Sequence, residues 1–481
     1  MAHNKFLPRV LAAAAAMMLL AGCGSKADPG FSPANPVNIT IWTYYNGEQL
    51  EAFNALVDEF NSTVGKEQGI MVESSSHGSV TDLENNVLAS AEGKVGAEAM
   101  PNIFSAYADT AYALDEMGQI ADLSDYLSEE DRAAFIEDYL SEGDFSGSGS
   151  IKIFPVAKSA ELLFLNETDW EPFAAATGAT YDDLATIEGL VSVAERYYEW
   201  TDAQTPDIPN DGRAFFGRDA MANYMLIGAK QLGCTIFDAQ DGCMTLNFDH
   251  DAVRTLWDNY YVPFIKGYFS ASGRFRSDDV KTGNIIAYVG SSSSATFFPT
   301  QVIADDMDSH DITRKALESP KFANGEDYAV QQGAGMVVTK ASDAEIQASL
   351  VFLKWFTSPE HNITFSVDSG YLPVTHEGNS IDAIRISGLA LSDEMDEVLS
   401  AAVDTVNKNH LYTPRAFSGG TNARAILEYS MSDKASADRA AVKEAMAQGQ
   451  SFEEASAQFL SDECFEAWYQ DTLASLEAFQ G

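Results

Sequence analysis

One stretch indicates the class of fold: VNITIWTYYNGEQLEAFNALVDEFNSTVGKEQGIMV, residues 37–72. Residues 37–42 alternate apolar and polar side chains, which is typical of a strand. Residues 48–64 carry apolar side chains along one helical face, and residues 70–72 form a second short strand. After another helix, a third strand is predicted over residues 101–107. Strands that alternate with helices in this way predict an α/β fold with a mostly parallel sheet.

The rest of the chain continues this alternation. A small polar break at residues 143–150 precedes a second lobe, in which Thr180 and Asp183 cap a helix. Residues 285–289 are continuously apolar, as in a strand that is buried on both faces. A further block begins at residue 328, and residues 392–479 form a helical tail with a break at 413–421.

Composition and charge exclude several classes of protein. The chain has 481 residues, of which 46% are hydrophobic, so it is globular rather than disordered. Acidic residues outnumber basic ones by 72 to 29, which gives a formal net charge of −43. Such a chain repels phosphate, so nucleic acid and anionic lipid are not expected partners. The body contains no run of 18 apolar residues that could span a membrane.

The first residues have the layout of a secretory leader. Lys5 and Arg9 precede an apolar core at residues 10–21, which ends in Leu20-Ala21-Gly22-Cys23. Small residues before a cysteine resemble the lipobox of bacterial lipoproteins. That resemblance implies a signal peptide over 1–22, a lipid on Cys23 and a flexible tether over 23–36. The alternative is an ordinary leader with a chance cysteine.

The remaining cysteines offer little chemistry. Cys234 and Cys243 flank a predicted hairpin with a turn at Asp241-Gly242, and they either form a disulfide or remain two free thiols. Cys464 lies in the amphipathic tail and is expected to be inert. No CxxC or HxxxH spacing occurs, so no metal site is predicted.

The sequence contains no recognisable catalytic motif, but it contains four polar or aromatic clusters that follow predicted strands. The sequence has no GxSxG elbow, no HExxH, no phosphate-binding loop and no GxGxxG at a helix start. Ligands of open α/β sheets bind at the carboxyl ends of strands. Clusters follow predicted strands at residues 42–46, 107–110, 158–161 and 291–294. Each also has a plainer interpretation as core, helix cap or solvated loop, but the four together favour a ligand site.

In this order the motifs resemble one family. A lipobox and tether are followed by ITIWT (39–43), PNIF (101–104), FP (154–155) with LFLN (163–166), and SGYLPV (369–374). The chain resembles extracytoplasmic solute-binding lipoproteins of carbohydrate-type ABC importers, above all the branch that binds glycerol-3-phosphate. The resemblance implies an α/β, two-lobed periplasmic-binding-protein-like fold with a hinge and a ligand cleft between the lobes. It also implies a permease, a separate ATPase, no cofactor, a monomeric chain and a membrane attachment through lipid alone.

The resemblance further implies how the lobes are assembled. The N-terminal lobe is expected to comprise residues 37–152 and 326–370. The C-terminal lobe is expected to comprise residues 153–325 and 371–481, including the helical tail.

Some residues of the family's site carry over by position. Lys158 and Ser159 fall in its hydroxyl-rich ligand loop, Gly333 at a glycine of close approach, and Tyr371 at a tyrosine that contacts ligand. Arg415 falls only roughly at its C-terminal arginine. Val80 and Ala108 stand where the glycerol-3-phosphate branch has a tyrosine and a glutamate, which argues against that ligand.

Physical reasoning supplies further candidate residues, since aromatic faces stack on sugar rings and polar groups bind their hydroxyls. Arg218 and Asn223 are weaker candidates, and Arg218 with Asp219 could instead form a surface ion pair. The predicted ligand-binding residues are Trp42, Tyr45, Tyr107, Asp109, Lys158, Ser159, Asp219, Ser292, Gly333, Tyr371 and Arg415.

The sequence therefore predicts a solute-binding protein and not an enzyme. The expected solute is a neutral sugar or oligosaccharide, because an acidic protein disfavours an anion. Three alternatives remain open: a binding protein for glycerol-3-phosphate or a sugar phosphate, a surface-anchored glycan hydrolase, and an adhesin or scaffold.

The lipobox leads to a first prediction. Cys23→Ser removes the thiol that carries the lipid, so the protein should be released or remain as uncleaved precursor. Fractionation of membranes and mass spectrometry of the N-terminus measure this, with Ser25→Ala as the control. A Cys23→Ser protein that partitions with membranes like the wild type would contradict the lipobox.

Overall fold

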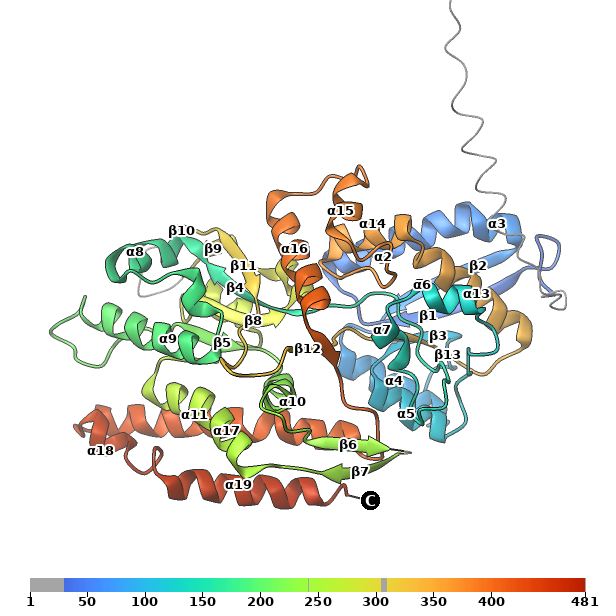
Figure 1. The fold of residues 1–481 in the computed structure, drawn as a ribbon. Coiled ribbons are helices and arrows are strands. Elements are labelled where there is room, and N and C mark those ends of the chain that lie inside the picture. Colours follow the sequence, from blue (N-terminus) through green and yellow to red (C-terminus); the bar gives the residue numbers. More distant parts are fainter. Residues whose placement is uncertain (1–29, 241, 304–308, 481) are drawn as a thin grey trace, which may run out of the picture.

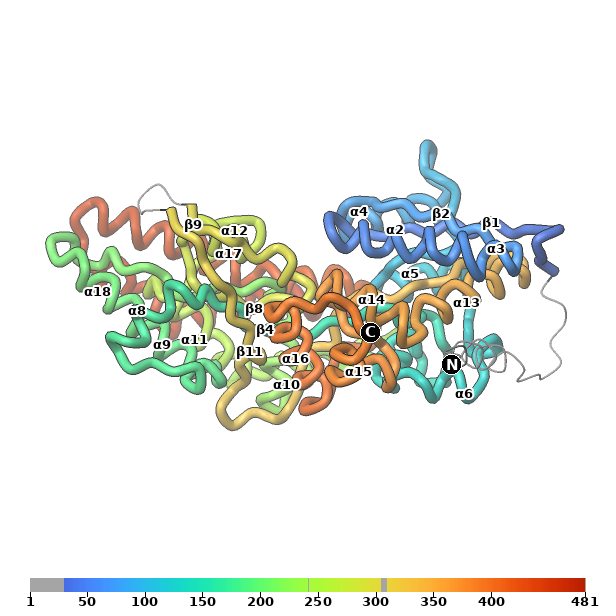
Figure 2. The backbone as a smooth tube through the Cα atoms, turned by 90° about the horizontal axis from the view of Figure 1, so that it is seen from above, coloured from blue at the N-terminus to red at the C-terminus, as the bar shows by residue number. Residues whose placement is uncertain are grey.

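The computed structural model describes residues 30–240, 242–303 and 309–480. Two α/β lobes lie side by side, joined in the middle of the molecule (Figure 1). The view from above separates the same two bodies along the long axis (Figure 2). The expected fold class is confirmed. The expected signal peptide, the lipidated Cys23 and the first half of the tether, residues 23–29, lie outside the described residues.

The first lobe is built on a four-stranded sheet with the order β13-β3-β1-β2. β1 pairs in parallel with β2 and β3, and β13 closes the other edge antiparallel to β3. The alternation read from the sequence explains the two faces, because Ile39 and Ile41 enter one core while Trp42 enters another. The strands are β1 (Val37–Thr43), β2 (Ile70–Ser76), β3 (Ile103–Ala106) and β13 (Gly335–Val338).

Helices cover both faces of this sheet. Apolar residues of α2 pack with α13 and α14 on one face, and those of α4 and α5 pack on the other. Ser79 caps α4, and Ser342 with Glu345 forms a capping box on α13. The helices are α2 (Gly47–Ser62), α3 (Val64–Gln68), α4 (Val80–Ala91), α5 (Ala108–Glu116), α6 (Glu129–Ala134), α7 (Glu137–Ser141), α13 (Asp343–Phe356) and α14 (Pro359–Ser369).

The second lobe has a mixed four-stranded sheet with the order β11-β4-β8-β5. β5 and β8 are parallel, and the other neighbours are antiparallel. β4 is buried along its whole length, with alternate side chains in two cores. The strands are β4 (Glu161–Asn166), β5 (Phe216–Arg218), β8 (Ala287–Ser291) and β11 (Arg314–Glu318), with small pairs β6 (Phe237–Gln240) with β7 (Cys243–Leu246) and β9 (Gln301–Val302) with β10 (His310–Asp311).

The helical tail forms part of the second lobe, where α17 packs against α10 and α11. α16 packs on the opposite side against β11 and β4. The remaining helices are α8 (Glu167–Thr177), η1 (Tyr181–Leu184), α9 (Ile187–Asp202), α10 (Met221–Gln231), α11 (His250–Lys266), α12 (Arg276–Lys281), η2 (Ser292–Phe297), α15 (Ile381–Ile386), α16 (Asp393–Lys408), α17 (Gly420–Ala447), α18 (Phe452–Ser456) and α19 (Asp462–Glu477).

Three crossing segments join the lobes, at residues 154–159, 331–336 and 370–374. Single bridges connect Phe154 to Met336, Ser159 to Gln332, and Lys158 to Leu372. Beside them, β12 (Tyr328–Val330) pairs in parallel with β14 (His410–Tyr412). The lobes also touch away from these segments. The Tyr112 hydroxyl of α5 lies against Gly242, and the Asp109 carboxylate lies against Gly420 at the start of α17.

One detail differs from the sequence-based expectation. Thr180 and Asp183 cap only the short η1, and a separate helix α9 begins after its own cap at Thr186. Of the two states left open for Cys234 and Cys243 in the predicted hairpin region, the structure shows free thiols. The reason is register: Gln240 pairs with Cys243, whereas Cys234 lies before β6 and donates to the carbonyl of Asn247. Asp241, in the predicted turn, lies outside the described residues.

Among the described residues, no helix combines the length and the apolar character that a bilayer crossing needs.

A buried ion pair fastens the crossing segments and gives a second prediction. Lys158 is fully buried, and its ammonium pairs with Glu142 and donates to the Gly333 carbonyl at 2.7 Å. Lys158→Met leaves the Glu142 carboxylate buried without its partner, which should lower the free energy of unfolding by about 3–5 kcal/mol. The double variant with Glu142→Gln should recover much of that loss. Urea unfolding measures both.

The exposed pair between Lys94 and Glu92 provides the control. Lys94→Met should change the free energy of unfolding by less than about 1 kcal/mol. If Lys158→Met is no more destabilising than Lys94→Met, the buried pair does not hold the crossing segments together.

Candidate functional site

Tyrosine hydroxyls gather at the end of β1. Tyr44 directly follows this strand, and its hydroxyl lies 3.4 Å from that of Tyr371, which follows α14. Tyr107 follows β3 and interacts electrostatically with Tyr371. Burial raises the pKa of the Tyr44, Tyr107 and Tyr371 hydroxyls, so they stay neutral. Neutral phenols can both donate and accept hydrogen bonds, which suits a polar, uncharged ligand.

Asp109 adds a carboxylate beside these hydroxyls. It lies in the first turn of α5, where a helix N-terminus favours negative charge. Burial raises its pKa to about 6, with Arg424 opposing the rise and Glu84 and Glu142 adding to it. The carboxylate also contacts the start of α17, because a Cβ at Gly420 would lie 2.4 Å from its Oδ1. Asp109 therefore sits at the seam between the lobes.

From the second lobe, a chain of polar contacts reaches the same seam. Arg424 of α17 donates to Oδ1 of Asn223 on α10, and the Asn223 amide donates to Glu161 Oε1 at 2.8 Å. The Arg218 guanidinium pairs with the other oxygen of Glu161. Both carboxylate oxygens of Glu161, the first residue of β4, are thus engaged. We call Tyr44, Tyr107, Asp109, Tyr371, Asn223 and Arg424 the interlobe site.

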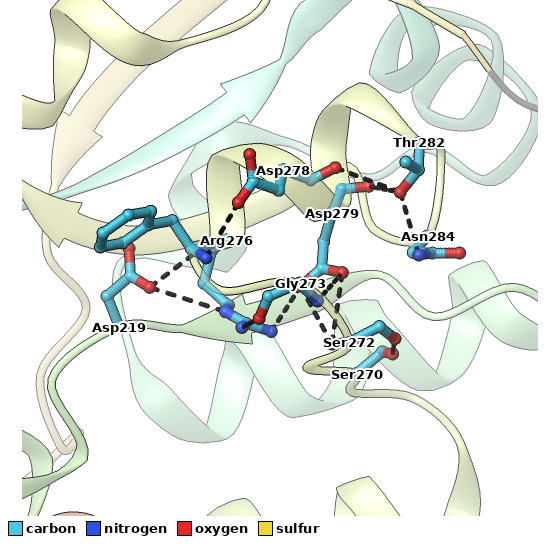
Figure 3. A network of polar contacts seen from close by, with 10 residues as sticks. Asp219, Ser270, Ser272, Gly273, Arg276, Asp278, Asp279, Thr282 and Asn284 are labelled. Atoms are coloured by element: carbon cyan, nitrogen blue, oxygen red, sulfur yellow. Dashed lines mark hydrogen bonds and ion pairs between the residues drawn. The ribbon is translucent and has the colours of Figure 1, made fainter.

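Asp219 belongs to a separate network around α12 (Figure 3). Its Oδ1 accepts from the backbone N–H of Arg276 at 3.2 Å and lies 3.6 Å from the Arg276 Nε. Burial raises the pKa of Asp219 to about 6, and the cation of Arg276 opposes that rise. Arg276 also pairs with Asp279, whose carboxylate accepts from the backbone of Ser272 and Gly273. Asp219 thus connects the end of β5 to this loop, and its contact with ligand stays a prediction.

Four predicted ligand residues lie in or against the crossing segments. The Ser159 backbone N–H donates to Gln332, and the buried Ser292 hydroxyl donates to the Gly370 carbonyl at 2.8 Å. Gly333 has φ of +97°, and a Cβ there would lie 2.9 Å from the Ala157 carbonyl, so the segments approach too closely for a side chain. With Lys158, these residues hold the hinge, and their contact with ligand stays a prediction.

Two predicted aromatic residues are placed in the cores of the first lobe. Trp42 packs with Phe104, and its ring lies 4.4 Å from that of His77. Tyr45 is 2% exposed and packs against Phe53 and Phe365. Their contact with ligand also stays a prediction.

One expectation is wrong, and several residues were missed. Arg218 does not form a surface pair with Asp219, because it is buried and bound to Glu161. Arg415 is exposed beside Gly147, while the arginine that acts on Asp109 is Arg424. The sequence reasoning did not name Tyr44, Glu142 or Glu161 as site residues. Tyr44 and Glu161 carried a signal, because they belong to the clusters at residues 42–46 and 158–161.

Within residues 30–240, 242–303 and 309–480, no group of three or more His, Cys, Asp or Glu side chains could hold a metal ion.

Solved structures with the same fold are numerous. A cyclic maltosyl-maltose binding protein from Arthrobacter globiformis has a TM-score of 0.64 and 17% identity, with 92% of this chain and 100% of that chain covered. The glycerophosphocholine complex of UgpB from Mycobacterium tuberculosis has a TM-score of 0.63 and 16% identity, covering 92% and 99%. A ribitol complex of an ABC transporter solute-binding protein from Agrobacterium radiobacter K84 has a TM-score of 0.61 and 17% identity, covering 92% and 99%.

At these identities the structures show a shared fold. A search of curated proteins finds no match. A sequence profile described as "Bacterial extracellular solute-binding protein" matches residues 55–384, which is more than half of the chain. The two α/β lobes, the crossing segments and this match agree with one another: the chain belongs to the bacterial extracellular solute-binding protein family.

Proposed function

We propose that this chain is the lipid-anchored receptor of an ABC importer, which binds a neutral sugar or oligosaccharide at the interlobe site and passes it to a permease. The extracellular family and the lipobox at Cys23 support the location. A hinge of three crossing segments supports capture by closure of the lobes.

The proposal of a neutral ligand rests on the pairing of the buried cations with carboxylates of the protein. Lys158 is paired with Glu142, Arg218 with Glu161, and Arg276 with Asp219 and Asp279. A phosphate needs uncommitted cationic donors, and these three are already neutralised by the protein. Sugar hydroxyls need only the tyrosine hydroxyls, the Asn223 amide and the Asp109 carboxylate. The long-range field of a chain with charge −43 adds to the preference against an anion.

A second candidate is a phosphodiester, and Arg424 favours it. This arginine reaches the seam from α17, and its hydrogen bond goes to the neutral Asn223 amide. One structural neighbour is a complex with glycerophosphocholine. The nearby Asp109, Glu84 and Glu142 oppose this ligand, because they surround the site with negative charge.

Hydrolysis is not proposed. The raised pKa values of Asp109 and Asp219 resemble those of catalytic acids. However, Asp219 is bound to Arg276 within its own lobe, and the family consists of binding proteins. A solute retained without change after incubation with the protein, as judged by mass spectrometry, would support this assignment.

The third prediction tests the charge of the ligand by calorimetry. Neutral maltose-type oligosaccharides should bind more tightly than glycerol phosphate, sugar phosphates or glycerophosphocholine. Tyr107→Phe should weaken sugar binding by about fivefold to tenfold, which corresponds to one hydrogen bond of about 1–1.4 kcal/mol. Exposed Tyr429→Phe is the matched control. Tight binding of a phosphate that Arg424→Ala abolishes would overturn the neutral ligand in favour of the phosphodiester.

The fourth prediction concerns pH and closure of the empty protein. Asp109 has a pKa of about 6 against α17 and an ordinary value near 3.8 once separation of the lobes exposes it. Between these values the closed form holds a proton that the open form releases, so acidification from pH 7 to pH 4 should favour closure. Small-angle scattering should show a smaller radius of gyration at the lower pH.

Asp109→Asn is the control for this effect, because it keeps the shape of the side chain and removes the titration. The variant should show no change of radius over the same pH range. If the variant and the wild type respond equally, Asp109 does not govern closure.

A further inference from the structure

A cavity of about 560 Å³ opens in the second lobe, and we call it the rear cavity. Its walls come from η1, α10, the end of β11, β12 and the last turn of α16. It has a size at which proteins hold small molecules, roughly 300–1,000 Å³. Of the interlobe site residues, none lines it, but the buried Glu161 and Arg218 lie at its floor. The cavity is therefore a separate place that shares a border with the interlobe site.

Tyrosine ring faces and aliphatic side chains form much of the wall. The hydroxyls of Tyr181 and Tyr224 are occupied elsewhere, since they donate to Glu167 and to the Leu256 carbonyl. These residues therefore line the cavity with rings rather than with free hydroxyls, together with Ile227 and Leu317. Tyr181 stacks on Trp170, and Arg218 lies over the ring of Tyr224, so the two residues add apolar ring surface against which another ring can pack edge-to-face.

Carboxylates outnumber cations in the cavity by four to three. The three cations are each paired with a carboxylate that also lines the cavity: Arg218 with Glu161, Lys321 with Asp327, and Lys408 with Glu318. The fourth carboxylate, Asp182, leaves a small negative excess, which disfavours an anion. A neutral molecule with hydroxyl groups can donate hydrogen bonds to the Asp182 carboxylate.

A short polar chain connects the floor of this cavity to the interlobe site. Glu161 binds Arg218 on the cavity side and Asn223 on the other, and Asn223 accepts from Arg424 at the seam. The wall strand β12 also continues directly into the crossing segment at residues 331–336. A molecule lodged between α10 and β12 would thus contact the strand that leads into the hinge, and Glu161, which binds Asn223.

We propose that this rear cavity is a second small-molecule site, for a neutral ring compound with hydroxyl groups, and that its occupancy is coupled to the interlobe site through Glu161 and Asn223. The existence of the second site stands on the cavity itself. The coupling rests on the proposed function of the interlobe site.

Phenyl β-glucoside is a suitable probe, because it joins an apolar ring to a neutral hydroxylated ring. Ser319→Trp fills the cavity from a loop that lines it, and Ala329→Phe fills it independently from β12. Ala323→Trp is the matched control, on an exposed residue that does not line the cavity. Tyr107→Ala disables the interlobe site, so each variant is made in both backgrounds. Ligand-observed NMR and calorimetry measure binding.

The expected result is binding of the probe to Tyr107→Ala protein, lost at least tenfold with Ser319→Trp or Ala329→Phe and kept with Ala323→Trp. Absence of binding to the wild type, loss with Tyr107→Ala alone, or equal binding to the Ser319→Trp and Ala323→Trp proteins would overturn the second site. A wild type that binds no solute at the interlobe site but keeps this pattern would overturn the proposed function alone.

Coupling is measured in the wild type, with an oligosaccharide bound at the interlobe site. Saturating phenyl β-glucoside should change the affinity for the oligosaccharide by about fivefold or more, the usual lower range of coupling between sites. Asn223→Ala, which interrupts the chain between Glu161 and Arg424, should remove most of that change. Equal affinity with and without the probe would overturn the coupling.

Discussion

The two-lobed arrangement depends on how Lys158 is held. Its backbone exchanges hydrogen bonds with Leu372, and its ammonium binds the Gly333 carbonyl and the Glu142 carboxylate. Lys158 therefore contacts both of the other crossing segments, and it also contacts Glu142, which directly follows α7 in the first lobe. A buried ammonium is costly unless it is paired and fully hydrogen-bonded, so the surrounding backbone is constrained to a narrow range of positions. Gly333 meets this constraint because any Cβ there would collide with the segment that carries Lys158.

Pairing of buried charges extends from this hinge into both lobes. Glu142 and Glu161 each neutralise one buried cation beside the crossing segments, and Asp279 neutralises Arg276 within the second lobe. In a chain with 72 acidic and 29 basic residues, a cation that enters the interior readily finds a carboxylate. The acidic composition thus has a structural consequence beyond solubility: it pairs Lys158, Arg218 and Arg276 with carboxylates of the protein, whereas Arg424 bonds to the neutral Asn223 amide.

Much of the fold followed from local patterns, because strand alternation and helix caps act over a few residues. The strands at Val37–Thr43 and Ile70–Ser76 and the helix Gly47–Ser62 between them form where the sequence predicts them. The division between η1 and α9 did not follow, since a second cap at Thr186 competes with Thr180. The pairing of Cys234 also depended on strand register, which a hairpin signal alone does not fix.

The site was less accessible to sequence reasoning, because its members come from segments far apart in the chain. The clusters at Tyr107 to Asp109 and at Tyr371 were found by their position after strands or by resemblance, and the structure brings Tyr44 between them. Arg424 has no local signature, and only the fold connects it through Asn223 to Glu161 of the cluster at residues 158–161.

The position of Glu161 also explains how one carboxylate lines the rear cavity and binds Asn223 of the interlobe site. As the first residue of β4, it leaves the crossing segment and enters a strand whose side chains alternate between two cores. Its side chain shares a face with Leu163 and Leu165, toward α10, where the rear cavity and Asn223 both lie. β4 and β5 both pair with β8, so Glu161 and Arg218 belong to one sheet and move together with the second lobe. The two oxygens of Glu161 therefore connect Arg218 and Asn223 within that lobe.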